Sequence, residues 1–173
     1  MPEVIVLNGA PCVGKTSVLA ELSALHRGTV AISGEALRAF APPDARAHLG
    51  GGATFKVAGA LAAAYLQLGA VRVVFEYVFL RAAHFRYFGE ALPAHVTVQI
   101  FTLWAPLELL LERDYRRPES QRAGVGIADN CREMQQNLAS MGRIVDVEAS
   151  APARLAARIH ELARQATAAS LSG

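Results

Sequence analysis

The chain has 173 residues, of which 53% are hydrophobic and 18% charged, and its formal net charge is +2. This length fits one domain, 1–173, and the hydrophobic fraction excludes a disordered chain. So small a charge gives no reason to expect nucleic acid or an anionic membrane as a partner, and the longest apolar stretch, 57–68, is too short to cross a bilayer.

A cytoplasmic location is expected because nothing at the start resembles a signal peptide. The two cysteines, Cys12 and Cys131, have neither zinc-site nor C-x-x-C spacing, which is typical of a reducing compartment. Oligomeric state stays open at this point.

Strand-like apolar runs alternate with helical patterns along the chain. We expect strands at Val4–Leu7, Thr29–Ile32, Val71–Phe75, Val96–Phe101 and Ile144–Val147, and helices near 15–26, 35–40, 54–68, 82–91, 106–114, 127–141 and 152–168. Strands that are apolar on both faces and separated by helices indicate an α/β fold with a parallel sheet covered on both sides. The segment 41–53, which holds two prolines and three consecutive glycines, is expected to be irregular or mobile.

The segment that follows the first strand, Gly9-Ala10-Pro11-Cys12-Val13-Gly14-Lys15-Thr16, fits the phosphate-loop pattern G-x-x-x-x-G-K-[ST]. It joins a strand to a helix N-terminus, where free backbone N–H groups and the helix dipole attract an anion. The sequence therefore predicts that residues Gly9 to Ser17 bind the phosphates of ATP, or of GTP. Lys15 would bridge the β- and γ-phosphates and the Thr16 hydroxyl would hold Mg²⁺.

Because ligands of such sheets bind where strands end, the residues after each later strand are candidates for the acceptor site. The second strand leads into Glu35 and Arg38, a carboxylate able to accept a hydroxyl proton and a cation able to pair with an anionic group. An ordinary helix start, with Ser33 as the N-cap, is the alternative interpretation.

The third strand ends in Glu76, where an acid reaches Mg²⁺ directly or through water or activates the acceptor. A solvated residue leaving the sheet is the alternative. If Glu76 is buried it needs a partner, which Lys15, Mg²⁺ or Arg81 would supply. Aromatic residues follow this strand and form either an acceptor pocket or core; they are Tyr77, Phe79, Phe85, Tyr87 and Phe88.

The fourth strand is followed by an arginine-rich stretch that predicts a mobile lid over 113–126. Arg113, Arg117 and Arg122 would close over the transferring phosphoryl group and neutralise the charge that develops there. A solvated basic face is the alternative. After the fifth strand, the backbone of 148–151 is placed to lie beside an adenine ring.

These residues resemble the small P-loop kinases of the adenylate kinase and shikimate kinase type, in which a phosphate loop, an acceptor region and an arginine-rich lid occur in this order. The segment 32–38 is similar to the acceptor segment of adenylate kinases, whose arginine contacts the acceptor phosphate. Glu35 stands where antibiotic kinases of the chloramphenicol phosphotransferase type have a catalytic aspartate. The segments 74–80 and 124–128 resemble the third strand and lid exit of that group, with Glu76 in place of an aspartate.

The resemblance implies a three-layer fold with strand order 2-3-1-4-5, an acceptor region at about 33–68, and an ATP- and Mg²⁺-dependent kinase acting on a hydroxyl of a small molecule. Catalysis would involve Lys15, Glu35 or Glu76, and the lid arginines. The chain has no long insert for a large lid domain, which makes a nucleotide acceptor less favoured. A nucleoside or nucleotide kinase and a nucleotide-binding regulatory protein with slow hydrolysis are the alternatives.

Overall fold

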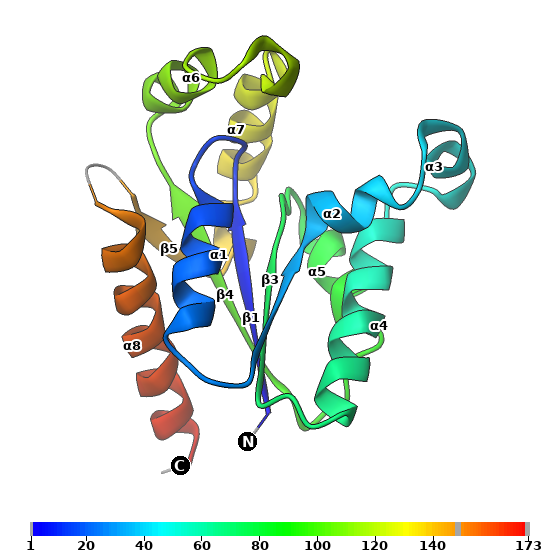
Figure 1. The fold of residues 1–173 in the computed structure, drawn as a ribbon, viewed down its shortest axis with the longest axis vertical. Helices are drawn as coiled ribbons and strands as arrows, with labels where there is room; N and C mark the ends of the chain where they lie inside the picture. The colour runs from blue at the N-terminus through cyan, green and yellow to red at the C-terminus, as the bar shows by residue number, and fades with distance from the viewer. Residues whose placement is uncertain (1, 148–149, 172–173) are drawn as a thin grey trace.

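A five-stranded parallel sheet forms the centre of the molecule (Figure 1). The computed structural model describes residues 2–147 and 150–171, with side chains described as far as residue 166. The strands are β1 (Glu3–Gly9), β2 (Thr29–Ser33), β3 (Arg72–Glu76), β4 (Thr97–Trp104) and β5 (Arg143–Asp146). Their order, β2-β3-β1-β4-β5, confirms the predicted topology.

Helices connect the strands and cover both faces of the sheet. They are α1 (Lys15–Ala24), α2 (Gly34–Ala39), α3 (Pro43–Leu49), α4 (Ala53–Gln67), α5 (Ala82–Gly89), α6 (Leu107–Tyr115), α7 (Gly126–Gln136) and α8 (Pro152–Leu171). Two short 3₁₀ turns, η1 (Glu119–Gln121) and η2 (Leu138–Ser140), lie in the connections. No single helix of the described chain is long and apolar enough to span a membrane. Among the described helices, only α3 and α4 taken together have the length and composition of a span, and they are bent by 86° relative to each other.

The central strand β1 separates two apolar cores, as the alternation of a buried strand requires. Ile5 and Leu7 pack with side chains of α1 and α8, whereas Val4 and Val6 pack with those of α4 and α5. All four side chains are fully buried. Because β1 is paired on both edges, by β3 and by β4, the loop that leaves it is held at the middle of the sheet.

Two predictions of local structure were wrong. The segment 41–53 is not irregular throughout, because α3 forms within it with Pro43 in its first turn, where a missing N–H costs nothing. Gly50, with φ 77°, ends that helix in a backbone conformation that favours glycine. The helix expected over 127–141 stops at Gln136 and continues only as the turn η2.

Candidate functional site

The phosphate loop lies at the carboxyl edge of the sheet, between β1 and α1. Gly14 has φ 105° and Cys12 φ 66°, so the loop turns through two left-handed residues before the helix begins. The Lys15 Nζ donates hydrogen bonds to the carbonyl oxygens of Gly9 (3.0 Å) and Ala10 (3.1 Å). Burial lowers the pKa of Lys15, and the nearby carboxylate of Glu76 opposes this effect. The ammonium group is thus held over the loop.

Asn8, the residue before the loop, joins three segments of the site. Its Oδ1 accepts hydrogen bonds from the backbone N–H groups of Gly9 (2.7 Å) and Phe79 (2.7 Å). Its Nδ2 donates to Thr102 Oγ1 (3.1 Å) and to Met141 Sδ (3.4 Å). Since Asn8 is fully buried, it fixes the start of the phosphate loop against the segment that follows β3. Asn8 was not predicted as a site residue, because a buried asparagine carries no sequence pattern that identifies it.

Glu76 lies at the end of β3 with only 2% of its surface exposed, so the interpretation as a solvated residue was wrong. Its Oε1 accepts a hydrogen bond from Ser33 Oγ (2.8 Å) and a long one from Thr16 Oγ1 (3.5 Å). Ser33 is therefore a partner of Glu76 and makes no side-chain N-cap bond to α2. The Arg81 side chain pairs with Glu133 rather than with Glu76.

Three oxygen donors gather at this point, from Thr16, Ser33 and Glu76. Hard oxygen ligands of this kind fit Mg²⁺, which keeps several waters and takes further ligands from substrate phosphates. No cluster of three or more His, Cys, Asp or Glu side chains able to hold a metal occurs among the described residues. The oxygens of Thr16, Ser33 and Glu76 are suited to an ion that also takes ligands from nucleotide phosphates.

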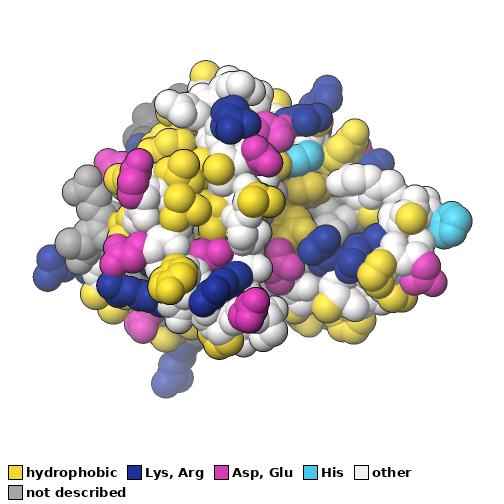
Figure 2. Space-filling model, turned by 90° about the horizontal axis from the view of Figure 1, so that it is seen from above, with side chains coloured by type: hydrophobic (Ala, Val, Ile, Leu, Met, Phe, Trp, Pro, Cys, Tyr) yellow, Lys and Arg dark blue, Asp and Glu magenta, His cyan; other side chains and the backbone are white. Residues whose placement is uncertain are grey.

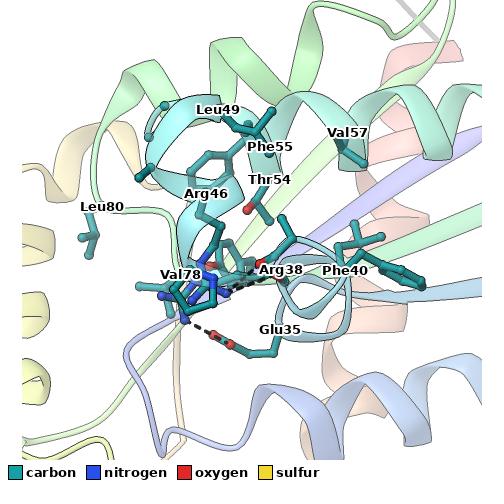
Figure 3. A pocket seen from close by; sticks show the side chains of 18 of the residues that line it. Glu35, Arg38, Phe40, Arg46, Leu49, Thr54, Phe55, Val57, Val78 and Leu80 are labelled. Carbon is teal, nitrogen blue, oxygen red and sulfur yellow. Dashed lines mark hydrogen bonds and ion pairs between the residues drawn. The ribbon is translucent and has the colours of Figure 1, made fainter.

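A cavity of about 580 Å³ lies above the loop and is lined by residues of the loop, of α2 and of the lid. A second, larger cavity of about 790 Å³ lies between α2, α3, α4 and the segment after β3 (Figure 3). The two cavities share five lining residues, which are Pro11, Glu35, Arg38, Tyr77 and Val78. The phosphate side and the second cavity therefore meet at Glu35.

Glu35 and Arg38 lie on one face of α2, and 3.8 Å separates Glu35 Oε2 from Arg38 Nη1. The Glu35 side chain is mostly exposed, and about half of the Arg38 side chain is exposed. The negative charge of Glu35 favours the protonated forms of both Lys15 and Tyr77. The pKa of Tyr77 is raised by burial and, to a smaller extent, by this carboxylate. The carboxylate is thus close to both the phosphate loop and the larger cavity. Figure 2 looks down on this edge of the sheet and shows a hollow with basic, acidic and hydrophobic side chains along it.

Two lid arginines reach the far side of the loop. Arg113 Nη1 donates to the Val13 carbonyl (3.1 Å), and both Arg113 and Arg117 line a third cavity of about 270 Å³ with Ser150 and Leu155. The pair thus lies near Ser150, which belongs to the segment expected beside an adenine ring, and Arg117 also lines the 580 Å³ cavity above the loop. Residues 148 and 149 of the predicted adenine segment lie outside the described residues.

Arg122 is held within the lid, because it donates to the carbonyl oxygens of Arg117 (3.1 Å) and Tyr115 (2.9 Å). It also lines the 580 Å³ cavity. The segment from Arg116 to Val125 contains only the turn η1, whereas the ends of the predicted lid, 113–115 and Gly126, belong to α6 and α7.

Asp114, a buried carboxylate at the end of α6, connects the lid to the phosphate loop. It accepts hydrogen bonds from the backbone N–H groups of Ala123 (2.8 Å) and Gly124 (3.0 Å) and from Cys12 Sγ (3.3 Å). The bond from Ala123 in particular holds the Asp114 pKa below its usual value. Burial and the bond to Asp114 raise the pKa of the Cys12 thiol. Asp114 was not predicted as a site residue, because the arginines that flank it dominate the charge pattern of this segment.

Comparison with known proteins agrees with this geometry. A family model described as AAA domain (AAA_33) matches residues 4–141. No curated protein sequence matches the chain significantly. Among solved structures, the tunicamycin resistance protein of Deinococcus radiodurans is similar with a TM-score of 0.69 and 20% identity, over 94% of this chain and 96% of that one.

Two further similar structures are named as kinases. A gluconokinase from Sinorhizobium meliloti 1021 has a TM-score of 0.63 and 21% identity, covering 99% of this chain and 98% of its own. A shikimate kinase from Acinetobacter baumannii, in complex with shikimate, has a TM-score of 0.60 and 19% identity, with coverage of 95% and 94%. At these identities the likeness establishes a shared fold.

Proposed function

The chain belongs to the AAA_33 family of AAA domains and has the fold of the small P-loop kinases, and from these premises we propose that it is an ATP- and Mg²⁺-dependent kinase. The acceptor is a hydroxyl group of a small molecule, and the enzyme acts in the cytoplasm, where ATP is available. One observation carries the proposal: the phosphate cavity and the larger cavity share a wall that includes Glu35, Arg38 and Tyr77. A donor phosphate and an acceptor hydroxyl can meet there.

In this proposal each residue acts at a defined place. The loop backbone and Lys15 bind the β- and γ-phosphates of ATP. Thr16 and Glu76 hold Mg²⁺, which supplies charge neutralisation on the phosphate oxygens when it is bound. Glu76 Oε1 accepts hydrogen bonds from Ser33 and Thr16. Because it lies beside Thr16, Glu76 is better placed to hold Mg²⁺ than to take a proton from the acceptor.

Glu35 then serves as the acceptor base, because its carboxylate lines both cavities and faces solvent-accessible space. It takes the proton of the acceptor hydroxyl while the oxygen attacks the γ-phosphorus and the bond to the β-phosphate oxygen breaks, leaving ADP. Arg113 and Arg117 hold the nucleotide on its other side. Closure of the lid would exclude water that otherwise hydrolyses ATP.

The test uses the two lysines of the chain as a matched pair. Lys15→Ala removes the ammonium over the phosphate loop and should lower kcat/KM by at least about 100-fold, since electrostatic stabilisation of the transition state is usually a large contribution. Lys56→Ala removes an exposed lysine paired with Glu90 and should leave activity within about twofold. The assay follows ADP formation and a mass gain of one phosphate over a panel of hydroxylated compounds that includes nucleoside monophosphates. Full phosphorylation by the Lys15 variant would disprove the proposal.

A further inference from the structure

The larger cavity is bordered by hydrophobic side chains that are exposed to solvent. Phe40, Leu49 and Val57 are exposed by 86%, 59% and 55%, and they come from the end of α2, the end of α3 and from α4 (Figure 3). Large apolar side chains that gather around one concavity are a feature of ligand sites, whereas scattered ones need no explanation. This rim is therefore a candidate surface for contact with the apolar part of a ligand.

The polar side chains of this cavity are few, and most of them already form hydrogen bonds or ion pairs within the protein. Six of the twenty lining residues have polar side chains, which are Glu35, Arg38, Arg46, Thr54, Tyr77 and Asn130. Glu35 pairs with Arg38, and a hydrogen bond joins the side chains of Thr54 and Tyr77.

Arg46 donates to the carbonyl oxygens of Ala41 (3.0 Å) and Arg38 (3.4 Å). A site for a polyhydroxylated acceptor must offer a partner to every hydroxyl, because an unpaired buried hydroxyl is unfavourable. In this cavity five of the six polar side chains already have a partner within the protein, so few groups are left for such hydroxyls.

The floor of the larger cavity and its volume also favour a ligand with an apolar part. Phe55 is 4% exposed and lies edge to face against Tyr77, with ring centroids 5.5 Å apart, while Val78 and Leu80 continue the apolar wall. A volume of about 790 Å³ lies in the upper half of the range of sites for drug-sized ligands, roughly 300–1,000 Å³. The cavity is suited to a molecule with a substantial apolar body.

We propose that the acceptor is an amphipathic hydroxyl compound, with its reacting hydroxyl at Glu35 and an aryl or branched-alkyl body against Phe40, Leu49, Val57 and Phe55. This inference rests on the proposed kinase function and narrows its substrate class. Compact polyols and sugar acids are excluded as preferred acceptors. The apolar body contributes affinity, and the few polar groups orient the hydroxyl toward the phosphate loop.

The experiment compares terminal 1,2-diols that share one reacting end. These are 1,2-propanediol, 1,2-hexanediol, phenyl-1,2-ethanediol and 2-naphthyl-1,2-ethanediol, with glycerol, gluconate and shikimate as polar references. Each buried methylene is worth about fourfold in affinity, so kcat/KM should rise at least tenfold from propanediol to the aryl diols. Calorimetric Kd values, measured without ATP, should follow the same order. Equal or better use of the polar references would overturn the inference.

Variants then connect the preference to the cavity. Phe40→Ser and Leu49→Ser remove exposed side chains, so folding is preserved, and each should lower kcat/KM for the aryl diols about tenfold with KM for ATP unchanged. Leu68→Ser is the matched control, because Leu68 is 83% exposed and lies outside the cavity. It should change nothing beyond about twofold, and equal effects of all three variants would contradict the proposal.

The two proposals fail in different ways. If the aryl diols bind with the predicted order and variant sensitivity but no compound gains a phosphate, the kinase function is refuted and the amphipathic site stands. If the aryl diols neither bind nor react while a polar reference is phosphorylated, the kinase function stands and the amphipathic acceptor is refuted.

Discussion

Replacing Asn8 by alanine should destabilise the protein strongly, because one side chain satisfies several buried groups. Its Oδ1 accepts from the backbone N–H groups of Gly9 and Phe79, both at 2.7 Å. Each buried donor left without an acceptor costs about 1–3 kcal/mol, and the lost bond to Thr102 (3.1 Å) adds about 1 kcal/mol. The expected loss is therefore about 3–7 kcal/mol, out of a total of about 5–15 kcal/mol for a typical domain.

Urea unfolding followed by far-UV circular dichroism measures this loss directly, and thermal unfolding should show Tm lowered by about 6–28 °C. Asn137→Ala is the control, since Asn137 is only half-buried and its Nδ2 donates one bond, to the Glu133 carbonyl (2.9 Å). That variant should lose less than about 1 kcal/mol. A loss below about 1 kcal/mol in Asn8→Ala, with an unchanged urea m-value, would refute the reasoning that this side chain holds the loop and the segment after β3 together.

Three further predictions concern charged groups. Glu76→Gln keeps the shape of the side chain but removes its charge beside Thr16, so the Mg²⁺ concentration for half-maximal activity should rise about 10- to 100-fold; an unchanged magnesium titration would exclude the metal-side role. Asp114→Ala removes the anchor of the lid, so trypsin should cleave at the lid arginines several-fold faster and KM for ATP should rise, and unaltered cleavage would show that the anchor is dispensable. His84 is stacked on Phe55 with a pKa lowered mainly by burial, so the unfolded state binds the proton first and stability falls as pH drops below about 6.5, the ordinary histidine value. The difference in unfolding free energy between pH 8 and pH 5.5 should be smaller in His84→Gln, and an identical difference would contradict this assignment.

The alternation of strands and helices could be predicted from the sequence because the signals were regular, whereas the strand order was implied by the resemblance to small P-loop kinases. Apolar runs of about five residues alternated with helical patterns, and the phosphate-loop motif fixed where the first strand ends and the first helix begins. Strand ends were displaced by one to three residues, as at β4, which continues to Trp104 rather than stopping at Phe101. Boundaries depend on hydrogen bonds across the sheet, which a local pattern does not contain.

The parts of the site that were missed depend on contacts between distant segments. Ser33 precedes a helix and so has the position of an N-cap, but its hydroxyl is directed to Glu76, 43 residues further along the chain. Arg81 follows Glu76 closely in sequence, yet it pairs with Glu133 on α7. Asp114 bonds back to the loop at Cys12. In each case the three-dimensional partner, rather than the residue type, decides the role.

The bond between Cys12 and Asp114 also has a thermodynamic consequence. Asp114 accepts from the loop residue Cys12 and from the lid residues Ala123 and Gly124 at the same time. Any ligand that changes the geometry of one side therefore changes the free energy of the other, and such coupling is reciprocal. If a nucleotide favours a closed lid, a closed lid favours the nucleotide by the same factor. In the proposed kinase, donor affinity and lid position would then form a single linked equilibrium, and an acceptor that stabilises the closed lid would raise the affinity for ATP.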